Sequence, residues 1–294
     1  MYFLSQLFNG LQSGAIYALI ALGYTMVYGI IKLINFAHGD LMIAGAYCLL
    51  FCLQAGIPFW AALLITLAAS ALLNVLIEKI AYKPLRNASR LSALITAIAV
   101  SLFLQSSFAL AFTSTPRRFP ISTDDFPFIS LGSLKLNVFV LGSIGVAVVL
   151  MILLQLFVHR TRLGKAMLAV SEDMDAARLM GINVSNTISL TFAIGAVLAA
   201  VAATLYVISY PQIHPFMGAL PGIKAFVAAV LGGIGQIPGA MLGGFILGVV
   251  EVLTKAYIPS AYSQLSDAVV FAILIVVLVV KPSGLVGKVQ REKV

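Results

Sequence analysis

Charged side chains are scarce in this sequence. Asp, Glu, Lys and Arg make up 10% of its 294 residues, whereas a soluble globular domain carries about 25%. Hydrophobic residues make up 61%, and the mean hydropathy is +1.08. This composition excludes a large soluble domain, because the polar gaps between apolar stretches are all short. The chain is therefore predicted to be a single transmembrane domain over residues 1–294, an all-α, polytopic helical bundle in lipid.

Cysteine is nearly absent as well. Cys48 and Cys52 are the two copies, four positions apart in one apolar segment. On a helix they would share a face, where a disulfide has poor geometry. No further Cys or His lies near them in sequence, so a metal site is not indicated. We interpret both as small apolar packing residues.

Several motifs that would indicate other functions are missing. The sequence contains no GxxxxGK[ST] stretch, so the chain is not expected to bind ATP through a P-loop. It shows no Ser–His–Asp set and no paired catalytic carboxylates, so neither an enzymatic activity nor a cofactor is expected. The net charge is +8, but the basic residues lie in scattered loops rather than on one stripe, which argues against nucleic acid.

Nine apolar segments follow one another along the chain. They cover residues 7–30, 41–56, 59–82, 91–113, 137–158, 185–210, 219–233, 239–257 and 262–280. Many approach the roughly 20 residues that cross a bilayer as a helix. Twelve of the eighteen basic residues fall within 79–90, 160–178 and 281–293, which places these parts in the cytoplasm. The N-terminus and the loop 114–135 are then expected outside, and the C-terminus inside.

Two interruptions depart from simple crossings. GIIKLINFAHGD separates the first two apolar segments, and a glycine-rich stretch divides residues 210–260 into two short segments that meet in mid-membrane or on the far side. Gly39 and Gly239 lie 200 positions apart, and paired breaks are typical of transporters built from repeats. Only two pairs of residues match at this spacing, Gly39 with Gly239 and Leu41 with Met241, so an internal repeat stays an open alternative.

Backbone groups freed at such breaks need protein or water partners, so the breaks are predicted to line a substrate pathway. The predicted lining residues are Asn35, Phe36, His38, Gly39, Asp40, Gly232, Gly233, Gly235, Pro238 and Gly239. The alternative is that His38 and Asp40 are solvated at the cytoplasmic interface, with Asp40 capping the helix that begins at Leu41.

Other features of the apolar segments have simpler interpretations. Glu251 and Lys255 are four apart and are expected to pair on one helix face. Lys224 and Asp267 are expected to snorkel from the outer ends of their segments to the interface. Two GxxxG pairs within residues 239–248 are interpreted as helix-packing devices.

The longest polar interruption with helical character is residues 161–183, TRLGKAMLAVSEDMDAARLMGIN. Ser171 is predicted to cap a helix of about two and a half turns, with acidic residues in its first turn and Gly181 ending it. A helix this short is unstable alone. It either packs on its own membrane domain or occupies a groove of a soluble partner.

Several stretches together resemble the permease subunits of branched-chain amino acid ABC importers, the LivH-type half of the LivH/LivM family. They are YALIALGYTMVYGII (17–31), INFAHGDL (34–41), AARLMGIN (176–183), KAFVAAVLGGIGQIPGAMLGG (224–244) and KPSGLVG (281–287). The resemblance covers essentially the whole chain.

The resemblance implies a permease that moves branched-chain or other apolar amino acids into the cytoplasm by alternating access, in a bacterial inner membrane. Its implied partners are a second homologous permease of LivM type, two cytoplasmic ATP-binding subunits and a periplasmic amino-acid-binding protein, with lipid around the bundle. It assigns ATPase coupling to Glu172, Asp173, Met174, Ala176, Ala177, Arg178 and Gly181.

Two alternatives stay open from the residues themselves. An ion-coupled secondary amino acid transporter working alone would bind its ion at Asp40, Glu251 or Asp267. A membrane-embedded enzyme would use His38 and Asp40, but it would need a nucleophile or metal partner that the sequence does not show.

Overall fold

The computed structural model describes residues 2–33, 35–86, 88–131, 134–259, 265–281 and 283–287. Its α-helices are α1 (Tyr2–Ile31), α2 (Leu41–Gln54), α3 (Phe59–Ile77), α4 (Arg90–Phe112), α5 (Val138–Arg160), α6 (Arg162–Glu172), α7 (Met174–Leu179), α8 (Val184–Ser209), α9 (Ala219–Gly232), α10 (Ile237–Tyr257) and α11 (Leu265–Val280). A 3-10 turn, η1 (Phe36–His38), precedes α2, and a π-helical turn, η2 (Glu78–Tyr82), follows α3.

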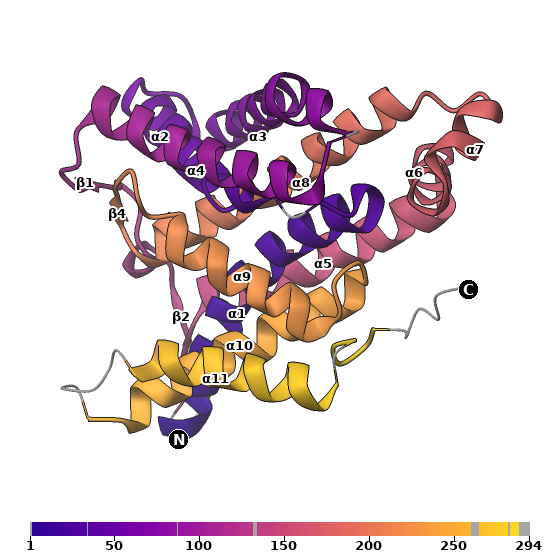
Figure 1. Cartoon of the computed structure of the whole chain (residues 1–294). Helices are drawn as coiled ribbons and strands as arrows, with labels where there is room; N and C mark the ends of the chain where they lie inside the picture. Colours follow the sequence, from indigo (N-terminus) through magenta and orange to yellow (C-terminus); the bar gives the residue numbers. More distant parts are fainter. Residues whose placement is uncertain are drawn as a thin grey trace.

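All nine predicted apolar segments are helices, which confirms the polytopic bundle (Figure 1). Among the described residues, seven helical stretches are long and apolar enough to cross a membrane, and α9 and α11 are shorter. The start of the ninth predicted segment, residues 262–264, and most of the predicted basic C-terminus, 288–294, lie outside the described residues.

Helix α1 forms the centre of the bundle. Its apolar residues extend around the whole helix, and 83% of its most apolar window is buried, as expected of a core helix. It packs against α5, α8, α9 and α10. Gly244 and Gly248 of α10 lie directly against the backbone of Ala18 and Gly14, where an added Cβ would overlap. The packing interpretation of the GxxxG pairs is confirmed, since small residues let helix backbones approach closely.

Four short strands join loops at one end of the bundle. β1 (Arg117–Arg118) pairs antiparallel with β4 (Gln212–Ile213), and β2 (Phe128–Leu131) pairs antiparallel with β3 (Leu134–Asn137). These strands, which the sequence analysis did not predict, lie at the opposite end of the bundle from α6 and α7 (Figure 1). The loop 114–135 and the coupling segment 161–183 are therefore on opposite sides.

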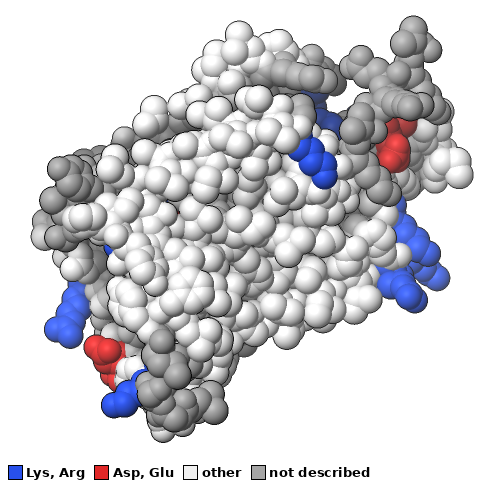
Figure 2. Space-filling view, turned by 90° about the horizontal axis from the view of Figure 1, so that it is seen from below, with Lys and Arg blue, Asp and Glu red and all other residues white. Residues whose placement is uncertain are grey.

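The surface between these two ends is apolar. Figure 2 shows Lys, Arg, Asp and Glu gathered toward opposite ends of one face, with a broad uncharged area between them. Helices α3, α4 and α5 contribute much of the exposed apolar surface, including Leu72, Phe103 and Leu153. A belt of this kind suits lipid or another membrane helix.

The α9–α10 hairpin was predicted to consist of two short segments. Helix α10 has 21 residues and is long enough to cross, so the expectation holds for α9 alone. The turn at 233–236 lies on the far side, beside Gly29 near the end of α1. There Leu285 N donates to Leu231 O at 2.9 Å, which holds the end of the described chain against α9.

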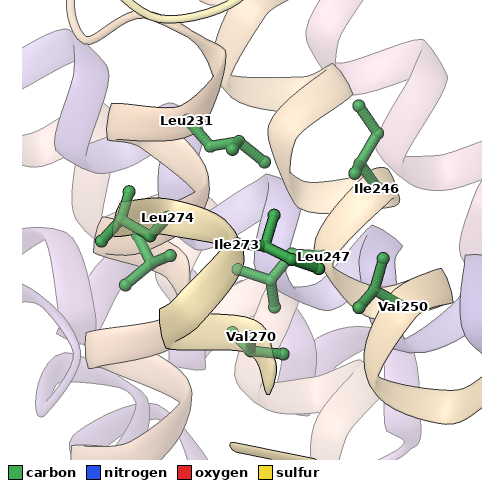
Figure 3. A pocket seen from close by; sticks show the side chains of 8 residues that line it. Leu231, Ile246, Leu247, Val250, Val270, Ile273 and Leu274 are labelled. Carbon is green, nitrogen blue, oxygen red and sulfur yellow. The ribbon is translucent and has the colours of Figure 1, made fainter. Parts of the chain in front are cut away.

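Helices α9, α10 and α11 leave a small gap between them. Figure 3 shows side chains from all three helices converging on it, with Leu231, Leu247 and Val270 among them. Its volume is about 10 Å³ and its lining is entirely apolar, so it has room for at most one water and no polar partners for it. We interpret it as a packing defect rather than a ligand site.

Candidate functional site

The break between α1 and α2 lies inside the bundle. Asn35, His38 and Asp40 are all less than 4% exposed. The rings of His38 and Tyr24 are 4.9 Å apart, and Tyr24 precedes the end of α1 by seven residues, about 10 Å along the helix. The alternative that His38 and Asp40 are solvated at the interface is wrong, because the surrounding helices cover both side chains.

His38 fills a notch between two glycines. A Cβ on Gly23 of α1 would overlap its ring, and a Cβ on Gly195 of α8 would be in van der Waals contact with it. Both ring nitrogens are buried and find no hydrogen-bond partner among the described residues. The sequence signal for this notch is one glycine in each of two apolar helices, and glycines are too common in the apolar segments of this chain to single out these two.

The side chain of Asp40 does not cap α2, so the capping part of that alternative is wrong as well. Its backbone is already helical (φ −77°, ψ −14°) and its side chain makes no capping bond. The carboxylate instead accepts hydrogen bonds from Ser101 Oγ and from Gln105 Nε2, the latter at 3.0 Å. Ser101 and Gln105 lie one turn apart on α4, so polar residues four apart in an apolar segment were the signal that the sequence analysis missed.

The remaining residues of the first break are fixed by neighbours. Tyr82 of η2 donates to Asn35 Oδ1 at 2.6 Å, and the rings of Phe36 and Phe226 lie 5.5 Å apart. Gly39 packs on Gly222 of α9, where an added Cβ would meet backbone. The start of α9 is therefore brought to the same depth as the break.

A pocket of about 260 Å³ opens beside this break. It is formed by α4, the start of α9 and the chain before α2. Its lining residues are Tyr24, Phe36, Gly39, Asp40, Ile98, Ser101, Leu102, Gln105, Gly218, Ala219, Gly222 and Ile223. The first break thus contributes Phe36, Gly39 and Asp40 to one cavity, while His38 packs behind it.

The second predicted half of the pathway lies elsewhere. Gly232 packs on Gly239 at the α9–α10 turn, and Gly233 contacts the backbone of Gly287. Gly233 and Gly235 have φ of +104° and +92°, which glycine adopts without strain. Pro238 is in the first turn of α10, where its missing N–H costs nothing. None of these residues lines the pocket, so in this conformation they form a turn rather than an opposite wall.

Four charged side chains form a cluster between α9, α10 and α11. Glu251 accepts from Lys224 Nζ at 2.8 Å, from Lys255 Nζ at 2.5 Å and from Tyr17 Oη at 2.8 Å, and Lys224 also lies 2.7 Å from Asp267. The predicted Glu251–Lys255 pair is confirmed. The prediction that Lys224 snorkels is wrong, because Lys224 is 5% exposed and reaches inward to two carboxylates.

The coupling segment folds as two helices rather than one. Thr161 Oγ1 accepts from Gly164 N to begin α6, and α6 continues through Ser171, whose hydroxyl donates to Leu168 O. The predicted Ser171 cap is therefore wrong. Asp173 caps the six-residue α7 instead, its Oδ1 accepting from Asp175 N and Ala176 N. Met167 and Val170 are buried and keep α6 helical past Ser171.

Gly181 ends α7 as predicted, with φ +82°. Ile182 N donates to Ala177 O and Gly181 N to Arg178 O, the pattern of a Schellman cap. This cap turns the chain back into α8 at the edge of the bundle.

The two faces of α7 differ in what they contact. Ala177 is buried and Met174 is half-buried against the bundle, whereas Leu179 and Met180 are 90% and 81% exposed. Leu179 and Met180 form an apolar tip, and Glu172, Asp173, Ala176 and Arg178, which precede it in the chain, are exposed as well. Leu179 and Met180 were not singled out from the sequence, although two apolar residues just before a helix-ending glycine were a usable signal.

A basic groove adjoins α7. Lys83, Arg86 and Arg178 line it together with Gly181 and Ile182. The coupling segment thus lies beside the first predicted cytoplasmic cluster of basic residues, although Lys83 and Arg178 are 95 positions apart in the sequence.

Comparison with known proteins identifies the family. Residues 6–278 match the model of the permease component of branched-chain amino acid transport systems. The chain belongs to this family. It is therefore a permease component of a branched-chain amino acid transport system, as the resemblance implied, and the family describes transport rather than catalysis.

Curated relatives of this permease extend over its full length. It is 42% identical to the high-affinity branched-chain amino acid transport system permease protein LivH of Salmonella typhimurium, over all of this chain and 98% of that protein. It is 43% identical to the corresponding protein BraD of Pseudomonas aeruginosa, with the same coverage. Both relatives are named as permease proteins, and this chain has seven membrane-length helices among its described residues.

The permease also shares its fold with a solved structure. PsaBC from Streptococcus pneumoniae in complex with Fab has a chain that superposes with a TM-score of 0.52, at 13% identity, over 96% of this chain and 93% of that one. At this identity the likeness concerns the fold alone.

Proposed function

We propose that this permease is the LivH-type membrane half of an ABC importer that moves branched-chain or other apolar amino acids into the cytoplasm. It pairs with a second, LivM-type permease and works with two cytoplasmic ATP-binding subunits and a periplasmic amino-acid-binding protein. Alternating access follows because ATP binding to the partners shifts the equilibrium between inward- and outward-facing states. The chain lies in a bacterial inner membrane, N-terminus outside and C-terminus inside.

The observation that carries this proposal is the apolar tip of α7. A six-residue helix is too short to fold alone, yet Asp173 and the Gly181 cap fix it at the edge of the bundle. Leu179 and Met180 then project from it with almost no cover. Exposed apolar residues surrounded by polar ones are typical of a protein interaction site.

The position of α7 supports a cytoplasmic partner. The helix lies beside the basic groove lined by Lys83 and Arg86, and clustered basic residues in short loops favour the cytoplasmic side. The groove of an ATP-binding subunit would bury Leu179 and Met180, and its motion would pass through Met174 and Ala177 to the bundle.

The test is whether the α7 tip holds the ATP-binding subunits. Leu179→Ser with Met180→Ser should abolish co-purification of those subunits with the membrane chain, because the apolar anchor is lost. The matched control is Leu110→Ser on α4, which is equally exposed at 90% and should retain them. Undiminished co-purification and uptake in the double variant would overturn the coupling role of α7.

Two of the three carboxylates named for the ion-coupled alternative, Glu251 and Asp267, already have cationic partners. Glu251 is paired with Lys224 and Lys255, and Asp267 with Lys224. These pairs already supply the positive charge that a coupling ion would bring.

A further inference from the structure

The pocket beside the first break contains a buried carboxylate with no cation. Asp40 is 2% exposed, and its hydrogen-bond partners in the described part of the chain, Ser101 and Gln105, are both neutral donors. No Lys or Arg described in the structure pairs with it, unlike Glu78, Glu251 and Asp267. An ionised carboxylate inside a membrane domain is costly unless a positive charge compensates it.

The opposite side of the same pocket carries a partial positive charge. Helix α9 begins at Ala219, and Gly218, Ala219 and Gly222 line the pocket. The 14 residues of α9 direct the positive end of their dipole toward this cavity. Interrupted helices that begin at membrane depth place their N-termini against anionic groups of substrates in other transporters.

Apart from Ser101, Gln105 and the hydroxyl group of Tyr24, the rest of the pocket wall is apolar. Ile98 and Leu102 of α4 and Ile223 of α9 line the pocket and are 44% to 58% exposed, while Phe36 lies deeper. The volume of about 260 Å³ is just below the range of about 300–1,000 Å³ typical of drug-sized ligands. The cavity thus combines the carboxylate of Asp40, the partial positive charge at the N-terminus of α9 and an apolar wall. These three features complement the α-ammonium, the α-carboxylate and the apolar side chain of an amino acid.

We infer that this pocket is a transient binding site for the transported amino acid. Asp40 binds the α-ammonium, the N-terminus of α9 faces the α-carboxylate, and Ile98, Leu102 and Ile223 contact the branched side chain. Ser101 and Gln105 are positioning residues that hold the carboxylate toward the cavity. This inference rests on the proposed function, because it assigns the substrate of that function to one cavity.

A thiol-protection experiment on the full-length chain in nanodiscs tests the site. With Cys48 and Cys52 replaced by Ala, a Leu102→Cys substitution places a reporter thiol on the pocket wall. L-leucine should slow its reaction with a maleimide. The matched reporter Leu110→Cys, two turns further along α4 and outside the pocket, should show no protection.

Fragments of leucine test separately the site proposed for the ammonium, at Asp40, and the site proposed for the carboxylate, at the N-terminus of α9. Isoamylamine keeps the ammonium and 4-methylpentanoate keeps the carboxylate. Asp40→Asn should raise the leucine concentration needed for protection roughly tenfold or more, since a hydrogen bond between charged groups is lost, and should abolish protection by isoamylamine. Asp40→Glu should partly restore protection by leucine and protection by isoamylamine. Equal protection in the wild type and Asp40→Asn backgrounds would overturn the role of Asp40.

If Asp40→Asn does not fold, a second variant, Ile98→Trp, still tests the site. Ile98→Trp narrows the pocket from its exposed rim and leaves the carboxylate intact, so it should also remove protection by leucine. Protection without uptake in the assembled transporter would support the site and contradict the proposed function. Normal uptake without protection in the wild type would contradict the site and leave the proposed function standing.

Discussion

At the scale of single residues, the membrane interior contains polar groups that the sequence located but did not explain. The motif INFAHGD marked His38 and Asp40 as unusual. Their partners Ser101, Gln105 and Gly23 come from other helices, and side-chain contacts between helices are not encoded in local periodicity. The residues were therefore predictable from the sequence and the contacts were not.

The His38 notch predicts a non-additive pair of substitutions. Gly23→Ala should destabilise the chain by about 1–3 kcal/mol, because the new methyl overlaps the ring. In a His38→Ala background the same change should cost much less, since the ring is gone. Thermal unfolding in detergent measures both, and additive losses would show that the notch does not depend on His38.

In the charged cluster around Lys224, one substitution should cost more stability than Gly23→Ala. Lys224→Met leaves Asp267 without its cation and Glu251 with only Lys255, and breaking a buried pair typically costs about 3–5 kcal/mol. Adding Asp267→Asn should recover part of this loss. Unfolding temperatures of the two variants provide the measurement, and an unchanged value for Lys224→Met would contradict the cluster's role in stability.

At the scale of elements, apolar length predicted the nine apolar helical stretches among the described residues, because lipid requires every backbone group to be satisfied within the helix. Capping was harder. Ser171 and Asp173 are both good caps, and tertiary burial of Met167 and Val170 decided between them. The strands β1 to β4 depend on pairing between distant loops, which local propensity does not contain.

The two faces of α7 predict different failures. Ala177→Leu should reduce the stability of the chain by about 1–3 kcal/mol, because this buried position is already filled. Ala176→Leu, on the exposed face next to it, should leave stability unchanged. A Tm series on the purified chain distinguishes the two, and equal Tm values would place Ala177 outside the packed interface.

At the scale of the whole molecule, the proposed orientation in the membrane is tested by labelling the two ends of the bundle. Asp175→Cys on α7 and Asp124→Cys in the loop 114–135 are both exposed. In a background without Cys48 and Cys52, an impermeant maleimide should label Asp124→Cys from outside the cell and Asp175→Cys only in inverted vesicles. The reverse pattern would invert the proposed topology.

The central claim is that this permease has no energy source of its own and is driven at α7. Leucine uptake into proteoliposomes tests it most directly, with the permease alone under ion gradients compared with the permease assembled with its partner permease, ATP-binding subunits and binding protein. We predict uptake only in the assembled system with ATP, and its loss in the Leu179→Ser/Met180→Ser variant. Accumulation of leucine by the chain alone under an ion gradient would contradict the account.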